Sequence, residues 1–143
     1  MKRVLRSTPL LRRALIALAV FASGFAASTV IAQAPSLAGL DRIEAGLWDV
    51  RSRDADGGHK QVCIENGRAL IQIRHPRDLC RSFVVEDSPT SMTVHYTCPG
   101  NGYGRTHIRV ENEHLAQIET QGISAGLPFD FSAEARRIGS CRP

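Results

Sequence analysis

The sequence has no acidic residue before Asp41 and no Cys-x-x-Cys pair anywhere. Aromatic residues make up only 6% of it, and all five histidines come before residue 115. Without closely spaced cysteines the common structural zinc sites are disfavoured. The lack of a histidine near the C-terminus argues against a serine hydrolase in which the histidine follows the nucleophile. The absence of early acids sets the N-terminal part apart from the rest of the chain.

The N-terminal part is typical of an export signal. Residues 1–13 carry five basic side chains, and residues 14–32 form a run of apolar and small residues that ends near Ala32-Gln33-Ala34. This order predicts a secretory signal peptide over residues 1–34, removed by cleavage near residues 32–34. The alternative is an uncleaved membrane anchor, because 19 residues is about the minimum length that spans a bilayer.

Removal of the signal changes the charge of the protein. The whole chain has a formal charge of +4, but the mature part has 13 basic against 14 acidic residues, a charge of −1. A nucleic-acid-binding domain needs a basic surface, so we expect no nucleic-acid partner. We expect a periplasmic or secreted protein that meets a membrane only if the signal stays uncleaved.

Four cysteines remain in the mature chain, at positions 63, 80, 98 and 141. An even number of cysteines in an exported chain predicts disulfides. Of the three possible pairings, we expect Cys63 with Cys80 and Cys98 with Cys141. Each of these would tie one local unit to the rest of the domain.

Alternation of apolar and polar residues with period two dominates after residue 45, which predicts strands with one buried face. Turn-forming residues separate these strands. One short helix is expected from the N-cap Asn66 to the residue before Pro76. The fold class is therefore all-β, an antiparallel meander of about seven strands curled into a barrel or half-barrel. The expected strands cover residues 46–53, 60–64, 81–86, 92–98, 105–110, 115–123 and 127–136.

The domain organisation follows from these segments. We expect residues 35–44 to be a flexible lead-in. Residues 45–143 should then form a single β domain held by two disulfides, long enough to bury a modest core.

Several short motifs together resemble a family of small exported Gram-negative bacterial proteins that is described as a domain of unknown function. The motifs are Gly46-Leu47-Trp48, Val62-Cys63, Tyr96-Thr97-Cys98 and the segment from Glu134 to Cys141. The resemblance covers about residues 44–142, although the first hairpin is shorter here than in many of those sequences. It implies export and a β fold with disulfides, and it implies no catalytic residues.

Three motifs suggest chemistry but have simpler interpretations. The segment from Gly122 to Gly126 matches the Gly-x-Ser-x-Gly elbow around Ser124, but a strand follows it where an elbow needs a helix. Asp54 and Asp56 resemble the start of a calcium loop, whose later ligands are missing. Glycines at positions 100, 102 and 104 are not followed by a helix that could bind phosphate, so we expect them to supply positive φ values. No catalytic residue and no cofactor is predicted.

Two histidines are weak candidates for a metal site. If residues whose numbers sum to 202 pair across the hairpin, His95 lies opposite His107, with Arg105 and Arg109 beside them. Two imidazoles make a weak site and the arginines repel a cation, so we interpret this face as solvated and basic.

Aromatic residues at positions 48, 83, 96, 129 and 131 lie on expected inward faces, where they form a core or line a ligand cavity. We expect Trp48 to be a core residue. If it is exposed instead, it joins Tyr103, Arg105, His107 and Arg109 as a candidate for a binding surface.

The functional expectation is a non-enzymatic periplasmic protein of the cell envelope that binds a partner protein or a small apolar ligand. An inhibitor of an envelope-attacking hydrolase is an alternative within this class. An enzyme of unrecognised type is the second class. An apolar cavity favours ligand carriage, whereas a solid core favours surface binding.

Overall fold

A computed structural model describes residues 35–54, 57–76 and 79–142. The expected signal peptide lies outside the described residues. Within these ranges no helix is long and apolar enough to cross a membrane. The elements are α2 (Ala38–Asp41), β1 (Gly46–Ser52), β2 (His59–Ile64), the 3-10 helix η1 (Gly67–Leu70), β3 (Arg81–Asp87), β4 (Ser91–Cys98), β5 (Gly102–Asn112), β6 (Leu115–Ser124) and β7 (Leu127–Gly139).

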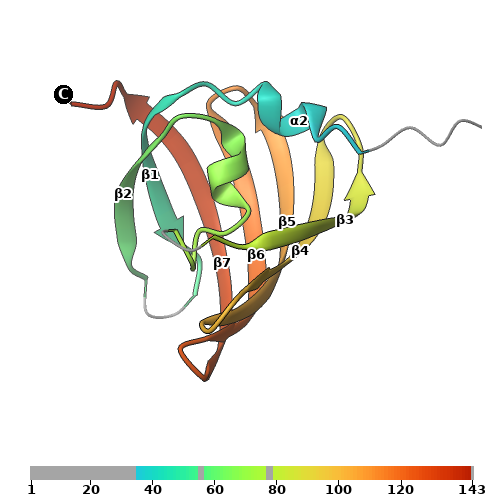
Figure 1. Cartoon of the computed structure of the whole chain (residues 1–143). Coiled ribbons are helices and arrows are strands. Elements are labelled where there is room, and N and C mark those ends of the chain that lie inside the picture. Colours follow the sequence, from blue (N-terminus) through green and yellow to red (C-terminus); the bar gives the residue numbers. More distant parts are fainter. Residues whose placement is uncertain (1–34, 55–56, 77–78, 143) are drawn as a thin grey trace, which may run out of the picture. The chain divides into compact units, whose positions relative to one another are not determined.

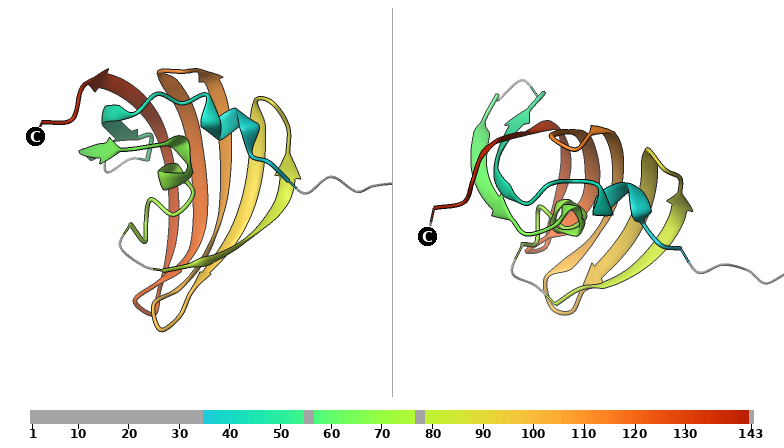
Figure 2. Two further views of the ribbon diagram at one scale, coloured as in Figure 1. Left: turned by 45° about the horizontal axis from the view of Figure 1, so that its top comes forward. Right: turned by 90° about the horizontal axis from the view of Figure 1, so that it is seen from above.

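All seven expected strands are confirmed, and all neighbouring strands are antiparallel. Strands β3 to β7 form a meander, but β1 pairs with β7 on one side and β2 on the other, so the order is β2-β1-β7-β6-β5-β4-β3. The sheet is strongly curved (Figures 1 and 2). It is not closed into a barrel, because β2 and β3 are its two edges and do not pair with each other.

The helical segments differ from the expectation in two ways. Asn66 caps η1 as expected, since its side chain accepts a hydrogen bond from the Arg68 N–H at 3.0 Å, but η1 has only four residues and turns continue to Pro76. Residues 35–44, expected to be a flexible lead-in, instead contain α2 and bury Leu40 completely. The sequence Leu37-x-x-Leu40-x-x-Ile43 places three apolar side chains on one face, and this spacing carries the segment into the core.

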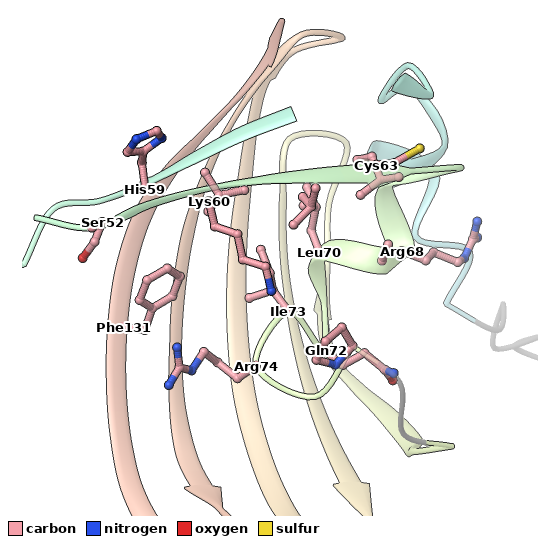
Figure 3. Close-up of a pocket in the computed structure, with 16 residues that line it drawn as sticks. Ser52, His59, Lys60, Cys63, Arg68, Leu70, Gln72, Ile73, Arg74 and Phe131 are labelled. Atoms are coloured by element: carbon pink, nitrogen blue, oxygen red, sulfur yellow. The ribbon is translucent and has the colours of Figure 1, made fainter. Parts of the chain in front are cut away.

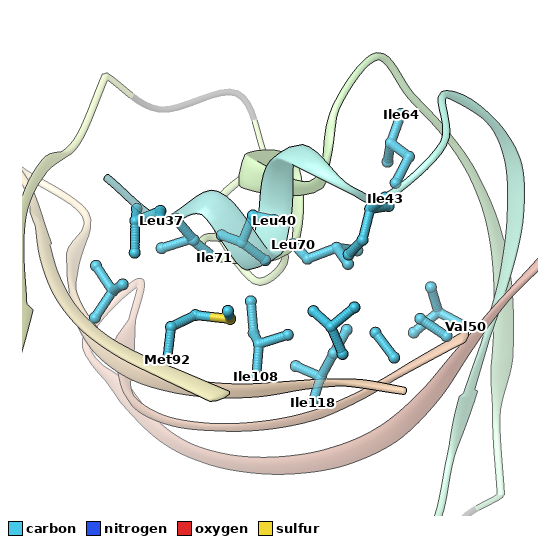
Figure 4. Close-up of a cluster of buried hydrophobic side chains, with 14 of the residues drawn as sticks. Leu37, Leu40, Ile43, Val50, Ile64, Leu70, Ile71, Met92, Ile108 and Ile118 are labelled. Atoms are coloured by element: carbon cyan, nitrogen blue, oxygen red, sulfur yellow. The ribbon is translucent and has the colours of Figure 1, made fainter. Parts of the chain in front are cut away.

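The core fills the hollow of the curved sheet (Figure 4). Leu40, Ile43 and Leu70 from the helical segments face Met92, Ile108 and Ile118 from the sheet, and all six are at most 4% exposed. Complete burial of such a side chain stabilises a fold by about 1.5–3 kcal/mol. Gly67 allows η1 to approach α2, since a side chain at this position would collide with the Leu40 carbonyl group.

The two disulfides are Cys63–Cys141 and Cys80–Cys98, so the expected pairing is wrong. Arg81 pairs with Thr97, and Cys80 therefore lies beside Cys98 at the end of the β3–β4 hairpin. Cys63 and Gly139 flank the two sides of Leu47, so the chain beyond β7 reaches Cys63 by passing the start of β1. Two disulfides indicate an oxidising, extracytoplasmic environment.

Candidate functional site

An open cleft lies between the β1–β2 hairpin and the segment that runs from η1 to Pro76. Its volume is about 460 Å³, within the usual range for sites of small molecules. Figure 3 shows its lining side chains drawn from both walls. The lining residues are Val50, Ser52, Gly58, His59, Lys60, Val62, Cys63, Ile64, Arg68, Ala69, Leu70, Gln72, Ile73, Arg74, Pro76 and Phe131.

The apolar wall follows from strand alternation. Val50 on β1 pairs with Lys60 on β2, and Trp48 pairs with Val62, so even-numbered residues of both strands face the hollow of the sheet. Phe131 adds an aromatic ring from β7, and it is only partly buried against the core. Ile73 closes the opposite side of the cleft. An apolar ligand would therefore replace water against aliphatic and aromatic side chains.

The charged residues around the cleft are of one sign. None of the sixteen described lining residues is acidic, whereas Lys60, Arg68 and Arg74 are basic. Arg68 forms an ion pair with Asp41. Within the described ranges, Lys60 and Arg74 have no ion-pair partner.

Arg74 is held in place by two aromatic rings. The carbon at the centre of its guanidinium group lies 5.5 Å from the ring centroid of Phe129 and 5.5 Å from that of Phe131. A cation over the face of an aromatic ring is attracted by the negative potential of that face. No described residue accepts a hydrogen bond from the Arg74 side chain, so its N–H donors are available for a ligand.

A buried polar cluster anchors the segment that carries Arg74. His75 is 1% exposed, with Nε2 3.3 Å from the Asn101 carbonyl oxygen and Nδ1 3.1 Å from the Tyr96 hydroxyl. Because a carbonyl oxygen only accepts, a neutral His75 ring carries its proton on Nε2 and accepts at Nδ1 from Tyr96. Burial raises the pKa of Tyr96, which keeps its hydroxyl group protonated.

Thr106 extends the same anchoring. Its hydroxyl group donates to the Ile71 carbonyl oxygen at 2.6 Å and lies 2.7 Å from the Thr120 hydroxyl, which is then the donor to Thr106. Both threonines are at most 2% exposed. The backbone on each side of Arg74 is thus fixed to the sheet, and the cleft wall is preorganised.

The surface candidates from the sequence lie apart from this cleft. Tyr103, Arg105, His107 and Arg109 follow one another at alternate positions of β5, on the face opposite to the buried Thr106 and Ile108. A shallower depression of about 350 Å³ borders Tyr103, Arg105 and His95. Trp48 is fully buried and donates from Nε1 to the Glu44 carbonyl oxygen at 3.0 Å, so it is a core residue and not part of a surface.

The candidate histidine pair is not formed. His95 lies opposite Arg105, and His107 lies opposite Thr93, so the pairs sum to 200 and not to the expected 202. The sum is even, as expected. It is smaller than expected because a loop of only three residues connects Cys98 to Gly102, with Gly100 at a φ of 79°. No cluster of three metal-ligating side chains occurs in the described part of the chain.

His107 belongs instead to a hydrogen-bonded chain on the outer face. Its Nδ1 lies 3.0 Å from the Thr93 hydroxyl, and that hydroxyl donates to Glu86 at 3.0 Å. Glu86 reaches this face because the strand pairing shifts between Val84 and Glu86. The chain explains why Thr93 is polar although it is 1% exposed.

Two motifs that suggested chemistry in the sequence, those around Ser124 and Asp54, form turns in the structure. Ser124 and Leu127 pair across a two-residue turn in which Ala125 and Gly126 have positive φ values, so a strand, and not a helix, follows Ser124. Asp54 accepts a hydrogen bond from the Gly57 N–H in the β1–β2 turn, while Asp56 lies outside the described residues.

The glycine-rich loop meets the expectation at two of its three glycines. Gly100 and Gly102 have positive φ values, but Gly104 does not. Gly104 is needed for another reason, because a side chain there would collide with the Tyr96 ring.

The phenylalanines are distributed differently from the expectation. Phe131 and Phe129 are partly buried, but Phe83 is 71% exposed because it pairs with His95 on the outer face of the sheet. Leu127, expected on the buried face of β7, is 70% exposed at the turn.

Lys60 and Arg74 were not predicted from the sequence. One signal was present for Lys60: it alternates with Val62 and Ile64, which places a cation on an otherwise apolar face. Arg74 has no such signal, since its place depends on turns and on rings more than 50 residues away.

Comparison with known proteins adds no relative. No protein-family description, no curated protein and no solved structure matches the chain.

Proposed function

We propose that this protein is a non-enzymatic binding protein of the bacterial cell envelope, which carries a small apolar ligand in the cleft between the β1–β2 hairpin and residues 67–76. The observation that carries the proposal is the cleft itself, with a volume of about 460 Å³ and a lining that includes Val62, Ile73 and Phe131. Such concave apolar sites with a few polar groups are the usual form of a small-molecule site.

The cellular location is part of the proposal. The two disulfides and the expected signal peptide agree with export to the periplasm. Membership of the family of small exported Gram-negative proteins, expected from the motifs, is part of the same proposal, although no family description matches the chain.

The experiment is a titration of the oxidised protein with a neutral dye whose fluorescence rises in apolar surroundings, such as N-phenylnaphthylamine. We expect saturable binding to one site. Ala69 is exposed on η1 and lines the cleft, so Ala69→Trp should fill it and abolish binding. Leu127→Trp is the matched control, because Leu127 is exposed and does not line the cleft. Equal dye binding by both variants would contradict the proposal.

A second candidate function is the binding of a partner protein, such as an envelope-attacking hydrolase. It is favoured by the edge strand β3 and the residues before it, where Leu79 is 94% exposed, Phe83 is 71% exposed and Val85 is 51% exposed. An exposed apolar edge is a common place for another chain to pair. A photo-crosslinking residue at position 83, but not at position 127, should then capture one specific protein in cells.

A further inference from the structure

The charges of the cleft restrict what kind of apolar ligand it takes. Lys60 and Arg74 extend from opposite walls, and no described lining residue is acidic. Figure 3 shows the Lys60 side chain reaching toward Ile73 and the Arg74 side chain lying beside Phe131. A neutral ligand would leave both cations without an ion-pair partner in the described part of the site, whereas an anion would supply one.

The geometry of Arg74 favours an anionic group in particular. The centre of its guanidinium group lies 5.5 Å from the ring centroids of Phe129 and Phe131, and it has no ion-pair partner among the described residues. A guanidinium group presents paired N–H donors that match the two oxygens of a carboxylate or phosphate. The anchoring of His75 to the sheet fixes the backbone beside Arg74 before a ligand arrives.

The volume restricts the size of the ligand. A water-sized group occupies about 30 Å³. A cleft of about 460 Å³ therefore holds roughly 15 such groups, which is the size of one acyl chain of moderate length.

We propose that the ligand of the cleft is a single-chain anionic amphiphile, with its chain against Val62, Ile73 and Phe131 and its acidic head between Lys60 and Arg74. This inference rests on the proposed function of the cleft. It adds the chemical class of the ligand and the two residues that select it.

The test compares dodecanoate with dodecanol as competitors of the bound neutral dye, below the concentrations at which either aggregates. The two molecules share a chain and differ in the charge of the head group. We expect dodecanoate to displace the dye at a concentration at least about tenfold lower than dodecanol, as for a hydrogen bond to a charged group. Added salt should weaken the displacement of the dye by dodecanoate and leave its displacement by dodecanol unchanged.

The variants Lys60→Met and Arg74→Met keep an apolar stem and remove the charge. Each variant should bind dodecanoate about tenfold more weakly than the wild type and bind dodecanol equally well. Arg105→Met is the matched control, because Arg105 lies on the opposite face of the sheet and should change neither competitor. Thermal unfolding of each variant verifies that the fold is intact.

The outcomes separate the two proposals. If the dye binds but both competitors are equally strong, or if neither Lys60→Met nor Arg74→Met changes their ratio, the anionic selectivity is wrong and the apolar site stands. If neither dye nor competitor binds the wild-type protein, the proposed function fails as well. Sedimentation with phosphatidylglycerol vesicles that is lost in Arg74→Met would overturn the single-chain ligand and assign a membrane headgroup instead.

Discussion

The Tyr96 hydroxyl lies 3.1 Å from Nδ1 of His75, and this hydrogen bond joins strand β4 to the segment that forms one wall of the cleft. Both side chains are at most 2% exposed. His75 is therefore one of the points, with Ile71, at which an irregular segment without strand pairing is attached to the sheet. Loss of one partner would leave a buried nitrogen without a donor.

Tyr96→Phe should lower the free energy of unfolding by about 1–3 kcal/mol, the usual cost of an unsatisfied buried polar atom. The exposed Tyr103 provides the matched control, since Tyr103→Phe removes the same hydroxyl from the surface. Urea unfolding, monitored by tryptophan fluorescence, measures the stability of both variants. Equal stabilities of the two variants would show that the His75 contact contributes nothing.

Trp48→Ala should cost about 3–5 kcal/mol, because Trp48 is fully buried and its removal leaves a large cavity. Phe83→Ala also truncates an aromatic residue of a strand, but Phe83 is 71% exposed and its loss should change stability by less than about 0.5 kcal/mol. Thermal unfolding monitored by circular dichroism distinguishes the two. A small effect at position 48 would contradict its place in the core.

Asp49 should make stability depend on pH. Hydrogen bonds from Arg51 at 2.6 Å and from His59 at 3.1 Å lower its pKa below the ordinary value. A lowered pKa in the folded state stabilises the protein above the unfolded pKa of about 4, and this contribution is lost as the pH falls through the folded value.

Asp49→Asn should therefore unfold at a lower temperature than the wild type at pH 7, and the difference should shrink below about pH 4. Asp130→Asn, at an exposed position of β7, is the control and should follow the wild type more closely. Scanning calorimetry across the acidic range gives both profiles. A difference that stays constant with pH would exclude the carboxylate as its source.

The disulfides should differ in how much they stabilise the fold. Cys63–Cys141 spans 78 residues and Cys80–Cys98 spans 18, which correspond to about 4.5 and 3 kcal/mol when each is treated as a constraint on the unfolded chain. The double variant C63S/C141S should then be less stable than C80S/C98S. Peptide mapping without reduction should recover the same two pairs, and a peptide that joins Cys63 to Cys80 would contradict them.

Local patterns of the sequence were sufficient to locate the strands, because alternation and turn residues act over a few positions. They were insufficient for relations that depend on the whole sheet. The pairing of Cys80 with Cys98 depends on the shift between Val84 and Glu86, and the run Phe83-Val84-Val85 has no alternation that would reveal it. The same run explains why the exposure of Phe83 was not foreseen.

The cleft could not be read from the sequence for a related reason. Its two walls come from β1–β2 and from residues 67–76, and Phe131 joins them only because β1 pairs with β7. Neither the strand order nor the path of the turns after η1 has a local signature. What the sequence does contain is the inward position of Lys60, which becomes informative once the cleft is known.

The pairing of β1 with β7 also sets the order in which the chain can fold. A chain emerging from its N-terminus has made β1 and β2 long before residues 127–139 exist, and until then one side of β1 has no partner. Strands β3 and β4 pair locally, so Cys80 can be oxidised with Cys98 without any contribution from β7. Cys63 must wait for Cys141 and is the thiol exposed longest to wrong partners. Completion of the long-range disulfide therefore depends on the last residues of the chain, whereas the local one does not.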